Sequence, residues 1–200
     1  MLSEADTIGQ DGKHSHNPNP VVSLLHHYLE QHGQGERECF LHADNCSGQN
    51  KNKTVIAYLA WRCWNELHTI ITLSFMVAGH TRLVDGCFGL LKRKYRRSDC
   101  FSMEQLAQVV NESAAPNVAQ WIPGSGVTWR EWAAFFMLHF KKKVPKIRSM
   151  HHFEFSSADV DGTVKYRRNV EDVWSSTKLL KATTNKEQLI EDGLPPMLPP

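Results

Sequence analysis

The stretch ECFLHADNCSGQNKNKTVIAYLAWRC, residues 38–63, decides the fold class of this chain of 200 residues. Its first part, residues 38–44, is apolar on both faces of an extended chain and predicts a short strand in a central position of a sheet. The strand ends on Asp44, and a polar loop of amides, glycine and lysine follows. Apolar residues then recur at every fourth position from Val55, which predicts an amphipathic helix over 53–68. A strand that leads through a polar loop into a helix indicates an α/β fold.

Strands and helices alternate outward from this stretch in both directions. Before it, Asn19 predicts the N-cap of a helix and Pro20 its first position. After it, residues 69–79 are rich in β-branched side chains and predict a buried strand. The remaining expected elements are a helix over 81–97, a capping-box helix over 102–113, a strand at 117–122, a helix with a buried tryptophan stripe over 128–140, and a hairpin of strands at 150–156 and 162–168. This order predicts an α/β fold with a mixed or parallel sheet flanked by helices.

Composition divides the chain into three segments. Residues 1–19 are polar with glycine, proline and asparagine, and predict a disordered tail. Residues 20–168 carry the regular patterns and predict one domain. Residues 169–200 are polar and end in GLPPMLPP, which predicts a proline-rich tail with no core to join.

Charge and cysteine content narrow the protein class. The formal net charge of +2 is too small to identify a nucleic-acid binder without local clusters. The five cysteines form no CxxC pair, and Cys39, Cys63 and Cys87 lie within apolar patterns, which predicts reduced core thiols in an intracellular protein. No signal peptide is evident, and the apolar run at 69–79 is shorter than the roughly 18 residues that a spanning helix needs. We therefore expect a nuclear or cytoplasmic protein that is neither secreted nor membrane-bound.

Two carboxylates follow consecutive predicted strands. Asp44 ends the first strand, and Asp85 lies forty-one residues later, near the start of the next helix. The carboxyl ends of adjacent parallel strands meet at one edge of a sheet, where two carboxylates suit Mg²⁺ or Mn²⁺. A structural alternative is equally open. Asp44 could form an Asx turn with Asn45 and Ser47, and Asp85 could be an ordinary acid in the first turn of a helix.

Several short sequence blocks in the chain resemble those of a known family. They are HADNCSGQNKN, VIAYLAWR, ITLSFM, GHT, FGLLK, YRR, NVAQ, WREW and HHFEFS. Over about residues 20–167, the chain resembles a eukaryotic domain of unknown function that occurs in many transposon-derived proteins of animals. More distantly, HADNCSGQNKN and the spacing from Asp44 to Asp85 are similar to DDE transposases and retroviral integrases. That similarity implies a ribonuclease H-like fold in which Asp44 and Asp85 are catalytic ligands of Mg²⁺ or Mn²⁺.

The DDE pattern also requires a third carboxylate from a strand upstream of residue 20. Here that region is the polar segment 1–19, in which Asp6 and Asp11 have no strand context. The resemblance therefore implies an incomplete ribonuclease H-like domain, a fragment that lacks its first strands and whose metal binding and activity are weak or absent. Supporting roles at the site are expected for Asn45, Gln49, Asn50 and His80, with scaffolding and capping as the simpler interpretations. His42, within the strand, is expected to be buried with its hydrogen bonds satisfied.

Two basic clusters flank this edge. KRKYRR, residues 92–97, holds five cations in six residues, and FKKKVPKIR, residues 140–148, holds the second cluster. Cations at a helix end also complement its macrodipole, so a solvated helix end is an equal alternative to phosphate contact. The candidate DNA-binding residues are Lys92, Arg93, Lys94, Arg96, Arg97, Lys141, Lys142 and Lys143.

The sequence leads to two functional hypotheses. The first is a transposon-derived domain related to metal-dependent DNA strand cleavage and transfer, with DNA as the partner of intact relatives. The second is a domesticated, non-catalytic module that binds nucleic acid or a protein. A degenerate copy without function is a third reading that no motif excludes.

Overall fold

The computed structural model describes residues 18–46, 50–76, 82–119, 126–144, 146–159 and 161–198, apart from the side chains of 82–85. The chain divides into two compact units. Unit 1 comprises Met1–Val77 and Thr128–Pro200, and unit 2 comprises Ala78–Val127. No helix within the described ranges is both long and apolar enough to cross a membrane.

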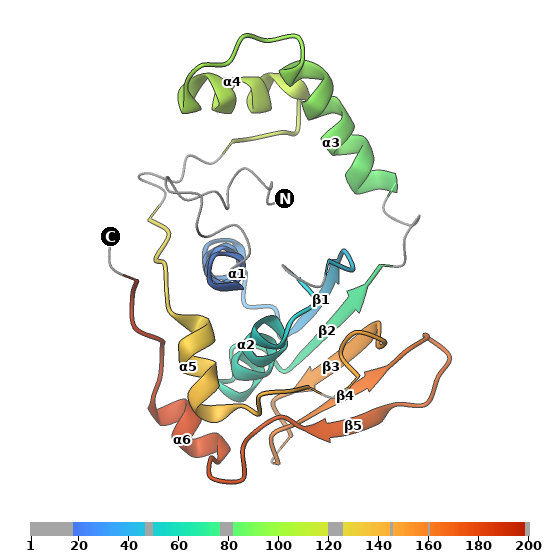
Figure 1. The fold of residues 1–200 in the computed structure, drawn as a ribbon, viewed down its shortest axis with the longest axis vertical. Coiled ribbons are helices and arrows are strands. Elements are labelled where there is room, and N and C mark those ends of the chain that lie inside the picture. The colour runs from blue at the N-terminus through green and yellow to red at the C-terminus, as the bar shows by residue number, and fades with distance from the viewer. Residues whose placement is uncertain are drawn as a thin grey trace. The chain divides into compact units, whose positions relative to one another are not determined.

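Unit 1 is built on a five-stranded mixed sheet in which the strands lie in chain order (Figure 1). The first two strands are parallel, and each later strand is antiparallel to its predecessor. The predicted α/β class, with a mixed sheet flanked by helices, is confirmed. The strands are β1 (Glu38–Ala43), β2 (Ile70–Phe75), β3 (His152–Ser156), β4 (Thr163–Arg167) and β5 (Ser175–Lys178).

The first strand does not occupy the central position predicted for it. β1 lies at one edge of the sheet, and its side chains alternate between exposed and half-buried. Apolar residues on both faces of this strand suggested burial on both sides, but Phe40 is 69 % exposed. His42, expected to be buried, is also exposed because it lies on the same face as Phe40.

Helix α2 (Lys53–Trp64) packs on the opposite face of the sheet and is surrounded by the other helices of unit 1. Every residue from Thr54 to Trp64 is buried. The sequence predicted an amphipathic helix, but a helix that is covered all round has no solvent face. The helices that pack on α2 are α1 (Pro18–His32), α5 (Trp132–His139) and α6 (Lys186–Glu191).

Aromatic rings join α2 to α5. The ring of Trp132 lies 5.1 Å from Tyr58 and 5.4 Å from Trp61, both in edge-to-face geometry. Trp64 stacks on Phe140 at 5.8 Å. Trp132 is fully buried, so the tryptophan stripe predicted for this helix does contribute to the core.

A buried arginine on α2 organises the contact with α1. The Nη1 of Arg62 donates to Glu30 at 2.9 Å and to the hydroxyl of Tyr58 at 3.1 Å, and it lies 3.2 Å from Nδ1 of His26. Its Nε donates to Nδ1 of His68 at 3.3 Å. Burial lowers the pKa of His26 to about 4, with Glu30 opposing the shift and Arg62 adding to it. His26 is therefore neutral near pH 7, where it can accept from the guanidinium.

Asn19 has a different role from the N-cap predicted for it. Helix α1 already begins at Pro18, and Asn19 is buried within its first turn. Its Oδ1 accepts from the backbone N–H of Ala133 at 2.7 Å, and its Nδ2 donates to Glu131 at 2.9 Å. Asn19 thus satisfies a free backbone donor at the start of α5 rather than of its own helix.

The segment 169–200 differs from the unstructured tail that was predicted. Strand β5 extends the sheet, and Leu179, Leu180 and Leu189 are buried in the core. The backbone N–H of Leu198 donates to Trp129 at 2.8 Å. Proline and polar residues dominate the composition of this segment, but burial of its few leucines is enough to hold the segment against the core.

Unit 2 is a pair of helices, α3 (Arg82–Tyr95) and α4 (Met103–Ser113), in contact with each other. The capping box predicted for α4 is present, since Ser102 accepts from the N–H of Gln105 and Gln105 accepts from that of Ser102. Residues 117–119 are not a strand, and the rest of the strand expected at 117–122 lies outside the described residues.

The cysteines only partly match the core thiols expected from the sequence. Cys63 is buried, and burial raises the pKa of its thiol to about 12. Cys39 is half-buried, whereas Cys87 is exposed on α3. The burial predicted for Cys87 from its apolar surroundings was therefore wrong.

We expect Leu189→Ala to lower the free energy of unfolding by about 2–5 kcal/mol, because a fully buried leucine would leave a cavity. Urea unfolding measures this change. The neighbouring Ile190 is 39 % exposed, and Ile190→Ala should cost about 1 kcal/mol or less. Equal, small effects of both substitutions would show that α6 does not pack on the core.

Candidate functional site

Asp44 lies exposed just beyond the carboxyl end of β1, beside the parallel strand β2. Its Oδ1 accepts hydrogen bonds from the backbone N–H of Cys46 at 3.1 Å and from Nδ2 of Asn50 at 2.6 Å. The first bond is the Asx turn that the sequence left open as the structural alternative. Within the described part of the chain no cation pairs with this carboxylate. The two bonds orient the carboxylate without neutralising it.

A buried lysine lies behind the same loop. Lys51 is 3 % exposed, and its Nζ donates to Oδ1 of Asn45 at 2.7 Å and lies 5.0 Å from the ring centroid of Phe75. Nδ2 of Asn45 lies 3.4 Å from Nδ1 of His151, which precedes β3. Burial lowers the pKa of Lys51 below its ordinary value. Lys51 and Asn45 therefore tie the loop after β1 to the start of β3.

The end of the same loop is held by helix α2. Asn52 is the N-cap of α2, and its side chain accepts from the backbone N–H groups of Thr54 and Val55. The polar residues after β1 thus have separate structural tasks: turn formation, bridging to β3 and helix capping.

A row of polar side chains crosses the sheet next to this loop. His42, Ser74, His152 and Arg167 are register neighbours on four adjacent strands. The Oγ of Ser74 lies 3.0 Å from Nδ1 of His152, and the guanidinium of Arg167 stacks over Trp174 at 4.2 Å. This row faces away from α2, because its members alternate with the buried residues of each strand.

Two imidazoles at this edge have lowered pKa values. Burial lowers the pKa of His152, and Arg167, His151 and His42 lower it further. Burial also lowers the pKa of His151, with added effects of Lys51 and Arg168. Each neighbouring charge disfavours a protonated imidazole, and an anion at this edge would relieve that repulsion. Both imidazoles therefore favour the neutral form, which can donate one hydrogen bond and accept another.

No described contact or distance brings the predicted pair of carboxylates, Asp44 and Asp85, together. Asp44 belongs to unit 1 and Asp85 to α3 of unit 2, and the side chain of Asp85 is not among those described. Gln49 and His80 lie outside the described residues. Within the described ranges, no group of three or more histidine, cysteine, aspartate or glutamate side chains is placed to hold a metal ion.

The basic clusters are placed within their own units. At the end of α3 and in the turn that follows it, Lys92, Arg93, Arg96 and Arg97 are exposed. Lys94 forms an ion pair with Glu112 of α4 at 2.8 Å. Among the described residues, no carboxylate pairs with the other four cations. Lys141, Lys142 and Lys143 are exposed in the segment after α5. Both clusters are available to solvent, as either interpretation of them requires.

Sequence reasoning missed Lys51, His152 and Arg167 as members of this edge. The alternation in HFEFS, residues 152–156, could have placed His152 on a polar sheet face. Nothing local marks Lys51 as buried, because its environment comes from β2 and β3.

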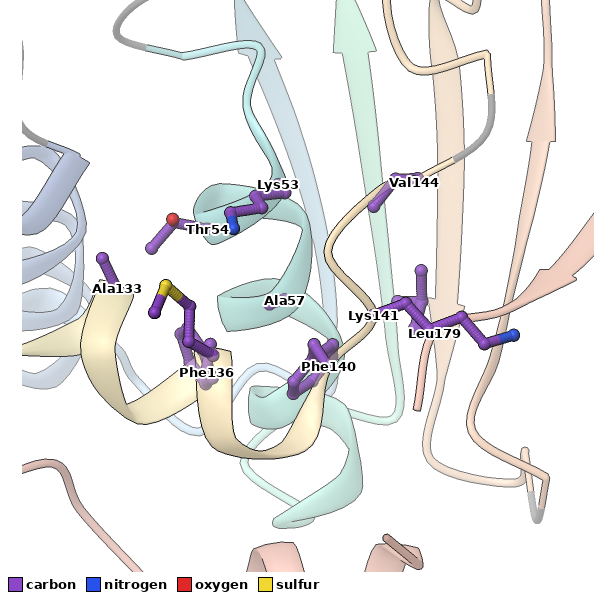
Figure 2. A pocket seen from close by; sticks show the side chains of 10 residues that line it. Lys53, Thr54, Ala57, Ala133, Phe136, Phe140, Lys141, Val144 and Leu179 are labelled. Atoms are coloured by element: carbon purple, nitrogen blue, oxygen red, sulfur yellow. The ribbon is translucent and has the colours of Figure 1, made fainter. Parts of the chain in front are cut away.

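A shallow pocket between α2 and α5 lies apart from this edge. Figure 2 shows Thr54 and Ala57 of α2 facing Ala133, Phe136 and Phe140 near its floor. Its free volume of about 20 Å³ would hold roughly one water molecule. The pocket is therefore a packing defect rather than a substrate site.

Comparison with known families gave one match. The model of the family described as Domain of unknown function (DUF7869) matches residues 6–172, most of the chain. Neither the curated proteins nor the solved structures contained a significant match.

We expect Lys51→Met to raise the pKa of His151, because the substitution removes a positive charge that lowers it. The free energy of unfolding should be unchanged or higher by about 1 kcal/mol, since methionine fills the buried space without a charge to desolvate. NMR titration of the imidazole signals and urea unfolding measure the two effects. Lys165→Met, at an exposed lysine paired with Glu154, is the control that should leave His151 unchanged. An unaltered pKa of His151 in Lys51→Met would contradict the described edge.

Proposed function

Since the chain belongs to the Domain of unknown function (DUF7869) family, we propose from its site that it is a ribonuclease H-like domain of transposase type that binds the phosphodiester backbone of DNA. The observation that supports this function best is the exposed, oriented carboxylate of Asp44 at the carboxyl end of a parallel strand pair. Ligands of α/β proteins gather at this end of parallel strands. A nuclear or cytoplasmic location would follow from such a role.

The donor set around Asp44 fits a divalent cation in part. An exposed carboxylate is the hard oxygen ligand that Mg²⁺ or Mn²⁺ prefers, and Asp85 would be the second. When bound there, such an ion would activate water or a 3′ hydroxyl for phosphodiester cleavage. Two other tasks would fall to side chains of the chain. Asn50 orients Asp44, and the cations Lys51 and Arg168 near His151 would attract phosphate. Asp44 is the one carboxylate of the predicted pair whose side chain is described, and a single carboxylate gives an ion few protein ligands, so metal binding should be weak.

We expect Mn²⁺ to broaden the backbone NMR signals of Cys46 and Asn50, and Asp44→Asn to abolish the broadening. Asparagine can still accept from the N–H of Cys46, so the turn should persist. Asp172→Asn is a matched control, because Asp172 is also exposed and accepts from a backbone N–H, that of Asn169, at 2.8 Å. Broadening that survives Asp44→Asn would remove Asp44 from the metal site.

Plasmid incubated with the chain and Mn²⁺ should show little nicking, because water would supply most of the coordination of a weakly held ion. Robust nicking that Asp44→Ala abolishes would instead identify an active enzyme.

A second candidate is a non-catalytic module that binds nucleic acid without metal. The exposed cations at the end of α3 favour it, because only Lys94 among the five is paired with a described carboxylate. Four such cations, two in the last turn of α3 and two in the turn after it, can contact a phosphate backbone without reading bases.

We expect reversal of Lys92, Arg93, Arg96 and Arg97 to glutamate to weaken DNA binding and to flatten its salt dependence. Loss of four phosphate contacts should reduce the slope of log K against log salt by about 3 to 4. Lys94→Gln is the control with a small effect, because Glu112 already neutralises Lys94. Fluorescence anisotropy over a salt series measures the slope. If charge reversal leaves the slope of log K against log salt unchanged, these cations do not contact phosphate and only solvate the end of the helix.

A further inference from the structure

The face of the sheet opposite α2 carries a continuous set of side chains from all five strands. Within unit 1, the helix that packs directly on the sheet does so on the other face, as Figure 1 shows for α2. The strand register and the alternation of burial assign the members of this open face. They are Glu38, Phe40, His42, Ile70, Thr72, Ser74, His152, Glu154, Ser156, Thr163, Lys165, Arg167, Ser176 and Lys178.

This face is mainly polar, and the row across its end terminates at the cation Arg167. Phe40 and Ile70 are its only apolar members, too few for the apolar centre of a stable protein interface. Glu154 is neutralised by Lys165 at 2.8 Å. The row formed by His42, Ser74, His152 and Arg167 contains no carboxylate. A negatively charged ligand would complement this row.

An aromatic side chain lies near each end of the row, on the same face of the sheet. Phe40 on β1 is 69 % exposed, so its ring presents most of its surface to solvent. Trp174, which directly precedes β5, stacks on the guanidinium of Arg167 at 4.2 Å. A stacked arginine and tryptophan form an extended planar surface on which a base can lie. Strand spacings of about 4.8 Å separate β1 from β4 by roughly 14 Å.

We propose that the open face binds single-stranded DNA, with bases stacked on Phe40 and on the Arg167–Trp174 pair and phosphates beside His42 and His152. This inference rests on the proposed DNA-binding function and specifies its substrate as a single strand. A single strand is required because the bases of a duplex are stacked on one another and cannot stack on a flat sheet face. Four-stranded sheets that bind single strands use aromatic rings for two or three bases in this way.

The test is fluorescence anisotropy of a fluorescein-labelled fifteen-nucleotide oligothymidine, about the length that one such platform engages, with the full chain. We expect Phe40→Ala and Trp174→Ala each to weaken binding roughly tenfold, the loss of one stacked base. Phe101→Ala and Val173→Ala are matched controls, because these residues are 88 % and 89 % exposed and neither belongs to a strand of the sheet. Trp174→Phe, which keeps an aromatic surface, should restore most of the affinity.

Each outcome decides the inference. Thermal unfolding establishes that each variant is folded, and Phe40→Ala at an exposed site should not change the midpoint. Binding unaffected by Phe40→Ala and Trp174→Ala, but lost on charge reversal in α3, would overturn the open-face site and keep DNA binding by the domain. Tenfold tighter binding of a fifteen-base-pair duplex or of oligouridine would overturn the single-stranded DNA assignment. No binding of any nucleic acid would overturn both this inference and the proposed function.

Discussion

The burial of α2 on all sides is the constraint on which unit 1 depends. Because every residue from Thr54 to Trp64 is buried, the helix needs the sheet on one side and α1, α5 and α6 on the others. A charged Arg62 in its last turn is tolerated because Glu30 and neutral His26 of α1, together with Tyr58 and His68, satisfy its guanidinium. The N-cap of the same helix fixes where the loop after β1 must end. Core and functional edge are therefore positioned by one element.

The loop after β1 lies between two groups of polar side chains at the edge of the sheet. On the side of α2, Lys51 and Asn45 anchor it to the segment before β3. On the other side, the row through His42 and Arg167 opens to solvent or ligand. The carboxylate of Asp44 lies at the junction of these regions. A ligand at this edge would meet Asp44 and Asn45 already held by hydrogen bonds to Asn50 and Lys51.

Local signals predicted the strand–loop–helix unit, the capping box of α4 and the β3–β4 hairpin, because each depends on neighbours in the chain. The predictions that were wrong concern features that depend on residues distant in the chain. The apolar faces of β1 do not reveal an edge position, since the edge is set by which strand lacks a neighbour. Asn19 looked like a local cap, yet it bonds to Ala133, 114 residues away. Asn45 and His151 are 106 residues apart, so no spacing in the sequence could have paired them.

Unit 1 is discontinuous in the chain, and this has a consequence for how it is made. Strands β1 and β2 precede unit 2, whereas β3, the antiparallel neighbour of β2, follows it. A chain emerging from the ribosome therefore carries β2 with one unpaired edge until residues 152–156 have been synthesised. The α3–α4 pair, whose contacts are local, can form during that interval. Assembly of the sheet then waits on a long loop closure, which makes the β2 edge the vulnerable point of biosynthesis.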